Sequence, residues 1–307
     1  MRLTLSIILG ASLCFAQSPI NVIFDTDMGN DCDDALALAM LHSLEKRGEA
    51  KLLAVTHTKG HPLAAALSER INTYYGRPNI PIGYTPNAPT PKIENPMLRL
   101  PGLTAKANYA DSVRAIQIAL EASPDGSVVI VQVGFSTNLA KLLDQPGAMD
   151  LIKRKVKFLS AMAGAFPAGK KEYNVYIDVA SARRVFRDWP TPIVFSGFEI
   201  GLALEFPAES ISKDFRHSPN NPVVEVYKTY MKFPHNRPTW DLTSVLYAVR
   251  PERKYFDVSV PGRVDVLDDG RTTWTADPNR NRRHLILKPE QKGRALEALV
   301  MLSSDPR

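Results

Sequence analysis

The 307-residue chain has only two cysteines, no run of five like charges, and no apolar stretch long enough to span a bilayer. One cysteine, Cys14, lies in an N-terminal segment that resembles an export signal. Removing that segment leaves Cys32 as the only thiol, which excludes an internal disulfide. The net charge of +6 comes from scattered Lys and Arg, a distribution that favours a solvated surface over a nucleic-acid interface.

The first sixteen residues predict a signal peptide. Arg2 supplies a positive start, Leu3–Leu13 is apolar, and Ala16 offers a small residue before a cut near Gln17. A lipid anchor at Cys14 is less favoured. We therefore expect residues 17–307 to form one domain, exported to a periplasm or to the medium and free of the membrane after cleavage. The sequence is compatible with a monomer and with a homo-oligomer.

Short apolar runs alternate with amphipathic segments through most of the mature chain. Strands are expected at Asn21–Phe24, Lys51–Thr56, Ile80–Gly83, Ser127–Val133, Val156–Ala163 and Pro192–Ser196. Helices are expected at Asp34–Arg47, Leu63–Tyr75, Asp111–Ala122, Thr137–Leu143, Val179–Asp188 and Thr239–Val249. This alternation predicts an α/β fold with a mainly parallel open sheet flanked by helices.

Two segments depart from the alternation. Thr85–Thr104 carries five prolines and is expected to be a long loop, of the kind that often serves as a lid or a binding loop. Val264–Leu267 and Arg271–Thr275 flank an Asp-Gly turn and predict a small C-terminal β-hairpin appended to the sheet.

Five aspartates follow the first expected strand within ten residues: Asp25, Asp27, Asp31, Asp33 and Asp34. Asp25 and Asp27 are two apart at the strand end, so both leave on the same side, at the edge where open α/β sheets place ligands. Asp33 and Asp34 begin the next helix and point about 100° apart, so one of them is free to contact a substrate.

So many carboxylates need protons or a metal ion. Two carboxylates about 4 Å apart repel by roughly 4 kcal/mol near a protein surface, whereas a helix N-terminus returns only about 0.3–1 kcal/mol per charge. Helix capping explains one aspartate and leaves the others unexplained. Oxygen ligands select a hard cation, so we expect Ca²⁺ or Mg²⁺ ahead of zinc.

Four segments together resemble the inosine–uridine-preferring nucleoside hydrolase family. The first is Asp25-Thr26-Asp27-Met28-Gly29-Asn30-Asp31-Cys32-Asp33-Asp34, which is similar to the family's Asp-x-Asp-Pro-Gly-x-Asp-Asp signature. The others, in order, are Gly134–Leu139, Glu172-Tyr173-Asn174 and Trp240-Asp241. The resemblance runs from about residue 21 to residue 249.

The resemblance implies a calcium-dependent hydrolase that cleaves the N-glycosidic bond of a small nucleoside or riboside. The implied Ca²⁺ ligands are Asp27, Asp34, the carbonyl of Thr137, and Asp241. Asp27 is also the implied base that takes a proton from the attacking water. The ribose-binding residues implied by the resemblance are Asp33 or Asp31, with His61, Glu172 and Asn174.

The sequence departs from the family where the base would bind. Trp240 stands in place of the family's histidine, and it can stack on a base but cannot donate a proton as an imidazolium does. His61 stands in place of an asparagine. The ribose and metal half of the site therefore matches the family better than the leaving-group half does, and the base preference stays open.

Two other functions remain as alternatives. A haloacid-dehalogenase-type phosphatase also has Asp-x-Asp after its first strand, but it wants Thr or Val where Gly29 stands and does not explain Asp33-Asp34. An exported, calcium-dependent riboside-binding protein without turnover is the other alternative, motivated by the missing histidine.

Overall fold

The computed structural model describes residues 18–91 and 95–305, so the expected signal peptide lies outside the described residues. Most strands belong to one twelve-stranded sheet, whose order is β4-β3-β2-β1-β5-β6-β8-β14-β12-β13-β7, with β11 paired to β14. The strands of this sheet are β1 (Ile20–Thr26), β2 (Ala50–His57), β3 (Ile82–Tyr84), β4 (Ala110–Asp111), β5 (Val128–Gln132), β6 (Val156–Met162), β7 (Ala168–Lys171), β8 (Ile193–Ser196), β11 (Asp257–Val258), β12 (Gly262–Val266), β13 (Arg271–Ala276) and β14 (Arg282–Ile286). Every neighbouring pair from β4 to β14 is parallel.

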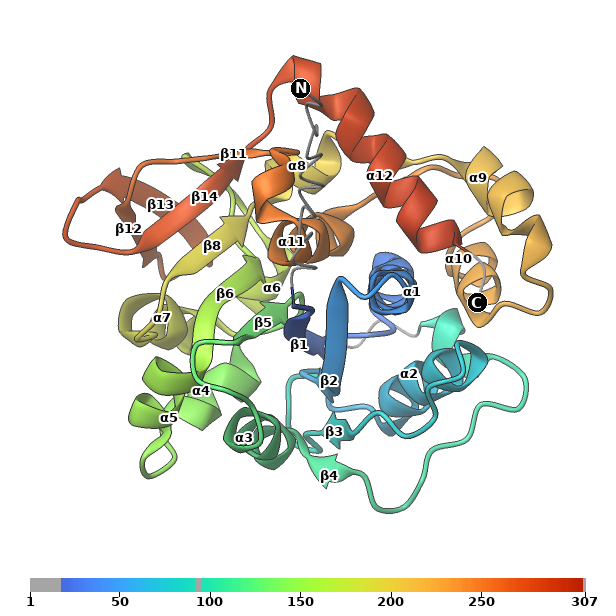
Figure 1. The fold of residues 1–307 in the computed structure, drawn as a ribbon, viewed down its shortest axis with the longest axis horizontal. Coiled ribbons are helices and arrows are strands. Elements are labelled where there is room, and N and C mark those ends of the chain that lie inside the picture. The colour runs from blue at the N-terminus through green and yellow to red at the C-terminus, as the bar shows by residue number, and fades with distance from the viewer. Residues whose placement is uncertain (1–17, 92–94, 306–307) are drawn as a thin grey trace, which may run out of the picture.

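Helices cover both faces of this sheet (Figure 1). The α-helices are α1 (Asp33–Lys46), α2 (Pro62–Tyr74), α3 (Ser112–Glu121), α4 (Thr137–Leu143), α5 (Ala148–Lys155), α6 (Tyr173–Ile177), α7 (Val179–Asp188), α8 (Phe198–Leu202), α9 (Ala208–Lys213), α10 (Pro222–Tyr230), α11 (Trp240–Val249) and α12 (Lys292–Ser304). Four 3₁₀ turns are η1 (Pro96–Arg99), η2 (Asp214–His217), η3 (Pro251–Arg253) and η4 (Pro289–Gln291), and β9 (Glu205–Phe206) pairs with β10 (Arg237–Pro238) as a separate ribbon. Among the described residues, no helix combines the length and apolarity that a membrane span requires.

The strand alternation divides the core into two layers. Val22 and Phe24 of β1 pack into the layer on the side of α1 and α11, whereas Ile23 packs into the layer on the side of α3. Figure 1 shows α1, α11 and α12 together on the first side and α3, α4, α5 and α7 on the second. Because the central strands are covered on both faces, their sequences are continuous apolar runs and do not alternate between apolar and polar residues.

The predicted α/β class and mainly parallel sheet are confirmed. The C-terminal hairpin is also present, as β12 and β13, but it is joined to the main sheet because β12 also pairs with β14 and β13 pairs with β7. The elements that were not predicted include β14, which extends the parallel run beside β8, the helices α5 and α10, and the C-terminal helix α12.

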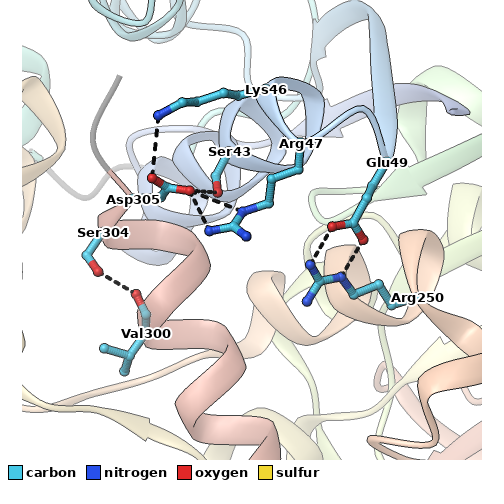
Figure 2. Close-up of polar contacts among 8 residues, drawn as sticks. All are labelled: Ser43, Lys46, Arg47, Glu49, Arg250, Val300, Ser304 and Asp305. Atoms are coloured by element: carbon cyan, nitrogen blue, oxygen red, sulfur yellow. Dashed lines mark hydrogen bonds and ion pairs between the residues drawn. The ribbon is translucent and has the colours of Figure 1, made fainter.

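Helix α12 is fastened to the end of α1 by polar contacts around Asp305 (Figure 2). The Asp305 carboxylate accepts hydrogen bonds from Ser43 Oγ at 3.2 Å and from Arg47 Nη2 at 2.7 Å. Nearby, Glu49 forms a two-bond ion pair with Arg250, with distances of 2.7 and 2.6 Å. The Asp305 contacts hold the C-terminal helix against α1, the helix that carries two of the site aspartates, whereas the Glu49–Arg250 pair joins the segment after α1 to the end of α11.

Candidate active site

A cavity of about 300 Å³ opens at the carboxyl ends of the central parallel strands. Two kinds of side chain line it. The acidic group comprises Asp27, Asp33, Asp34, Asp241 and Glu172, and Asn30, Val133, Met162 and Asn174 also line the cavity. The aromatic group comprises Tyr173, Tyr176, Phe198, Tyr230 and Trp240, and Asp31, Lys171 and Arg237 complete the lining.

Three elements bring the four acidic residues together. Asp27 follows the end of β1, Asp33 and Asp34 open α1, and Asp241 is the second residue of α11. All four are at most 4% exposed. One carboxylate oxygen each from Asp33, Asp34 and Asp241 lie within 4.8 Å of one another, which is a spacing that one cation can bridge.

The electrostatics of this cluster call for a positive ion. Burial, followed by repulsion from neighbouring carboxylates, raises the pKa of Asp34 and that of Asp241 well above the usual range. Burial also raises the pKa of Asp27, to about 6. Asp34 Oδ1 accepts a hydrogen bond from the Thr26 hydroxyl. Asp34 Oδ2 is buried and has no hydrogen-bond partner among the described residues. A buried carboxylate oxygen without a donor is costly, so these residues fit a divalent cation.

Asp27 is held from behind by an asparagine and a buried lysine. Asn30 Nδ2 donates to Asp27 Oδ2 at 2.5 Å. Lys59, only 2% exposed, donates its Nζ to Asn30 Oδ1 and to the carbonyl of Gly29 at 3.3 Å. The lysine charge lowers the pKa of Asp27 and partly offsets the effect of burial. Neither Asn30 nor Lys59 was predicted as a site residue, although Asn30 lies inside the aspartate motif.

The proline-rich segment packs on the same motif. Gly29 has a φ of +91°, a conformation that favours glycine, and a Cβ at this position would come within 2.6 Å of Leu98 Cδ2. Asn95 Nδ2 donates to the carbonyl of Asn30 at 3.1 Å. The described part of the expected loop therefore contains η1 and covers the turn that carries Asn30.

Glu172 and Asn174 lie at the cavity, but both already have protein partners. Glu172 caps α6 and accepts from the backbone N–H groups of Asn174 at 2.8 Å, Gly164 at 3.0 Å and Val175 at 3.2 Å. Burial nevertheless raises its pKa to about 7. Asn174 Nδ2 donates to the carbonyl of Val133 at 2.7 Å. Their contact with ribose stays a prediction.

Two predicted site residues do not reach the cavity. Thr137 opens α4, and its hydroxyl donates to Asp178 at 2.6 Å; the backbone residue that lines the cavity at this strand end is Val133, four positions earlier. His61 is the N-cap of α2, where its Nδ1 accepts from the N–H of Leu63 at 3.3 Å. The geometry therefore does not support a Thr137 carbonyl ligand or a ribose contact from His61.

Asp31 and Trp240 do line the cavity, each with a partner that sequence reasoning missed. Asp31 forms an ion pair with Arg237, so Asp33, nearer the other acids, is the better placed to contact a sugar. Trp240 Nε1 donates to the carbonyl of Phe198 at 2.9 Å, and the two rings stack with centroids 5.4 Å apart. Arg237 had one signal in the sequence, its place three residues before Trp240.

Solved nucleoside hydrolases share this fold. The plant enzyme PpNRh1 is 21% identical, with 94% of this chain and 100% of that chain covered and a TM-score of 0.73. The inosine-uridine preferring nucleoside hydrolase from Bacillus anthracis is 17% identical over 93% and 99% of the two chains, with a TM-score of 0.73. The purine-preferring ribonucleoside hydrolase from Gardnerella vaginalis is 18% identical over 92% and 98%, with a TM-score of 0.70.

The sequence match shows the family as well as the fold. Residues 22–303 match the family model described as inosine-uridine preferring nucleoside hydrolase, and the chain belongs to that family. It is therefore an N-ribosyl hydrolase that acts on small nucleosides, as the four motifs predicted. A comparison with curated proteins gave no match. The phosphatase alternative is set aside, because the family match spans residues 22–303.

Proposed function

We propose that residues 17–307 form a single catalytic domain that hydrolyses the N-glycosidic bond of ribonucleosides or related ribosides in a calcium-dependent reaction. The products are the free base and ribose. One observation carries this proposal: Asp27, Asp33, Asp34 and Asp241 are buried together at a cavity that five aromatic side chains also line. The acidic group suits a cation and a sugar, and the aromatic group suits a planar base.

Ca²⁺ is the cation that the residues fit best. Asp27, Asp34 and Asp241 would hold it, with Val133 in place of Thr137 as the source of a backbone oxygen. These are all hard oxygen ligands, and within the described part of the chain no histidine or cysteine lines the cavity, which disfavours zinc. A bound cation neutralises the carboxylates and lowers the pKa of a water molecule beside them.

Asp27 is the proposed general base. Its Oδ2 is committed to Asn30, and no side chain of the described residues donates to its Oδ1, which leaves that oxygen for the water. The water oxygen forms a bond to C1′ while its proton passes to Asp27. The C1′–N bond breaks, and its electron pair stays with the departing base. The sugar develops positive charge in this step, and the neighbouring carboxylates stabilise it.

The test is release of reducing sugar by the mature chain, expressed from Gln17 and supplied with Ca²⁺, from a panel of purine and pyrimidine nucleosides. Asp27→Asn keeps the shape but removes the base, and it should lower kcat at least about 100-fold. Asp265→Asn, on the exposed face of β12, is the matched control and should match wild type.

Release that requires Ca²⁺ and is lost in Asp27→Asn supports the proposal. A wild-type protein that binds ribosides and Ca²⁺ but releases no sugar would instead establish the alternative, a riboside-binding protein without turnover. Release at full rate in the presence of a chelator would remove the calcium requirement.

We also propose that the chain is exported through cleavage of residues 1–16, on the basis of Arg2 and the apolar run that follows it. Mass spectrometry of the protein recovered outside the cytoplasm tests this proposal. A mature N-terminus at Gln17 supports it, and recovery of the intact chain from the cytoplasm contradicts it.

A further inference from the structure

Arg237 of β10 lines the cavity and lies over two of its aromatic rings. Its guanidinium carbon lies 4.9 Å from the ring centroid of Tyr230 and 5.1 Å from that of Trp240. Guanidinium groups stack favourably on such ring faces. The guanidinium therefore lies beside Tyr230 and Trp240, two of the aromatic rings against which the proposed function places the base.

The orientation of this guanidinium is fixed by Asp31. Arg237 Nε lies 2.9 and 3.0 Å from the two Asp31 oxygens, and Nη2 donates to Oδ2. Tyr230 Oη donates to the same carboxylate at 3.3 Å. Arg237 Nη1 has no hydrogen-bond partner among the described residues. The two-bond pair with Asp31, called the clamp below, therefore leaves one nitrogen of the guanidinium free to donate elsewhere.

A departing base needs help from the residues that line the cavity. When the C1′–N bond breaks, the base takes both electrons and becomes an anion, which a group must protonate or stabilise. Among the residues that the structure describes, no histidine lines the cavity. The phenol of Tyr230 is already used by Asp31, and burial raises its pKa far above neutral.

We propose that Arg237 is the leaving-group residue of this enzyme, donating from Nη1 to the departing base, and that Asp31 is its positioning residue. This inference rests on the proposed hydrolase function. The guanidinium keeps its proton throughout: it stabilises the base anion through a charge-assisted hydrogen bond, and the anion takes its proton from solvent after release. Trp240, which replaces the family's histidine, holds the guanidinium over its ring.

A comparison of two substrates distinguishes a leaving-group role of Arg237 from a purely structural role. Inosine releases hypoxanthine, whose anion needs stabilisation, whereas p-nitrophenyl β-D-ribofuranoside releases p-nitrophenolate, which is stable without help. Both should be measured at saturating Ca²⁺ with the mature enzyme. Arg237→Gln should lower kcat for inosine about 100-fold or more, the range seen when one transition-state donor is removed, and change kcat for the nitrophenyl riboside less than about 3-fold.

Two further variants test the geometry. Arg237→Lys keeps the charge but loses the two-bond clamp, so it should recover part of the inosine rate. Asp31→Asn weakens the clamp and should lower the inosine rate about 10-fold, selectively again. Arg263→Gln, which breaks the exposed pair between Arg263 and Asp265, is the matched control for loss of an Arg–Asp pair and should change neither rate.

Several results would overturn the inference. Equal losses on both substrates would show that Arg237 only maintains the cavity, and unchanged inosine turnover would show that another group serves the base. A selective inosine loss in Lys171→Gln, with none in Arg237→Gln, would transfer the role to the exposed lysine that lies 4.5 Å over the Tyr176 ring. A wild type inactive on both ribosides would remove the proposed function itself.

Discussion

Asn30 Nδ2 donates to Oδ2 of Asp27 at 2.5 Å, and this single contact sets which oxygen of the proposed base remains available. The Asn30 side-chain amide is held in this orientation, because Lys59 Nζ donates a hydrogen bond to its Oδ1. A buried lysine therefore orients the base indirectly, through Asn30. Groups that orient a ligand or a base in this way commonly change metal affinity or activity by about 10- to 100-fold when they are removed.

The first prediction concerns Asn30→Ala. The hydrogen bond from Asn30 lowers the pKa of Asp27, which burial has raised to about 6, so its loss should raise that pKa further. A larger fraction of Asp27 is then protonated at pH 6, and Ca²⁺ binding weakens. At pH 8 the carboxylate is ionised in both proteins, and the difference shrinks. Isothermal titration calorimetry with Ca²⁺ at the two pH values measures the difference in Ca²⁺ affinity between the two proteins.

The expected loss of Ca²⁺ affinity in Asn30→Ala is about 10-fold at pH 6. Asn279→Ala removes an exposed asparagine from the turn before β14 and serves as the control, with no change expected. An equal loss of affinity at both pH values would mean that Asn30 acts on the shape of the site rather than on the ionisation of Asp27.

The second prediction concerns the stability of the metal-free protein. Asp25 is fully buried, accepts from Thr56 at 2.6 Å and Asn138 at 2.8 Å, and has a second oxygen without a partner. Burial raises its pKa from 3.8 to about 7. Between these values the folded protein holds a proton that the unfolded chain has released, so the stability contributed by this proton is lost as the pH rises from about 4 to about 7.

Asp25→Asn should remove this dependence. Three pKa units correspond to roughly 4 kcal/mol at most, so the metal-free wild type should lose more stability between pH 4.5 and 7.5 than the variant does. Urea unfolding in the presence of a chelator measures the two slopes. Parallel curves would show that Asp25 stays ionised in the folded protein.

The third prediction is that Ca²⁺ raises the unfolding temperature and that the rise requires Asp34. The cation relieves the repulsion among Asp33, Asp34 and Asp241, and ligand at 100 times its Kd stabilises by about 2.7 kcal/mol. Wild type should therefore gain several degrees in Tm, and chelation should reverse the gain. Asp34→Asn should gain less than one degree. A gain of equal size in Asp34→Asn would place the cation elsewhere.

The sequence was most informative where local pattern and topology agree. Apolar runs in β1, β5 and β6 predicted the central strands, and the carboxyl ends of parallel strands meet at one edge whatever the details. Asp27, Asp33 and Asp34 could therefore be assigned to one site from the first motif. The matched helix start at Trp240-Asp241 added a fourth acid from more than two hundred residues away.

The rest depended on contacts that no local pattern encodes. Helix α12 has apolar residues at helical spacing, from Ala295 to Leu302, yet nothing in the sequence says that it lies on α1. Thr137 and Val133 are four residues apart, and a motif alone cannot say which of them faces the cavity. Arg237 and Asp31 meet across 206 positions, so their pairing appears only in the folded chain.

The last prediction concerns Gly201, which packs against the start of the helix that carries Asp241. A Cβ on Gly201 would lie 2.5 Å from Cα and 2.6 Å from N of Trp240, which are backbone atoms that cannot rotate away. The N–H of Thr239 also donates to the Gly201 carbonyl at 3.2 Å. Gly201→Ala must therefore push the N-terminus of α11 outward and carry Asp241 with it.

We expect Gly201→Ala to lower the free energy of unfolding by about 1–3 kcal/mol, the usual cost of overpacking, and to weaken Ca²⁺ binding. Gly293→Ala is the matched control: its Cβ would meet no atom within 4 Å, and alanine favours a helix by up to about 1 kcal/mol over glycine. Urea unfolding and Ca²⁺ titration measure both effects. If Gly201→Ala lost stability but kept full Ca²⁺ affinity, the position of Asp241 would not depend on this contact.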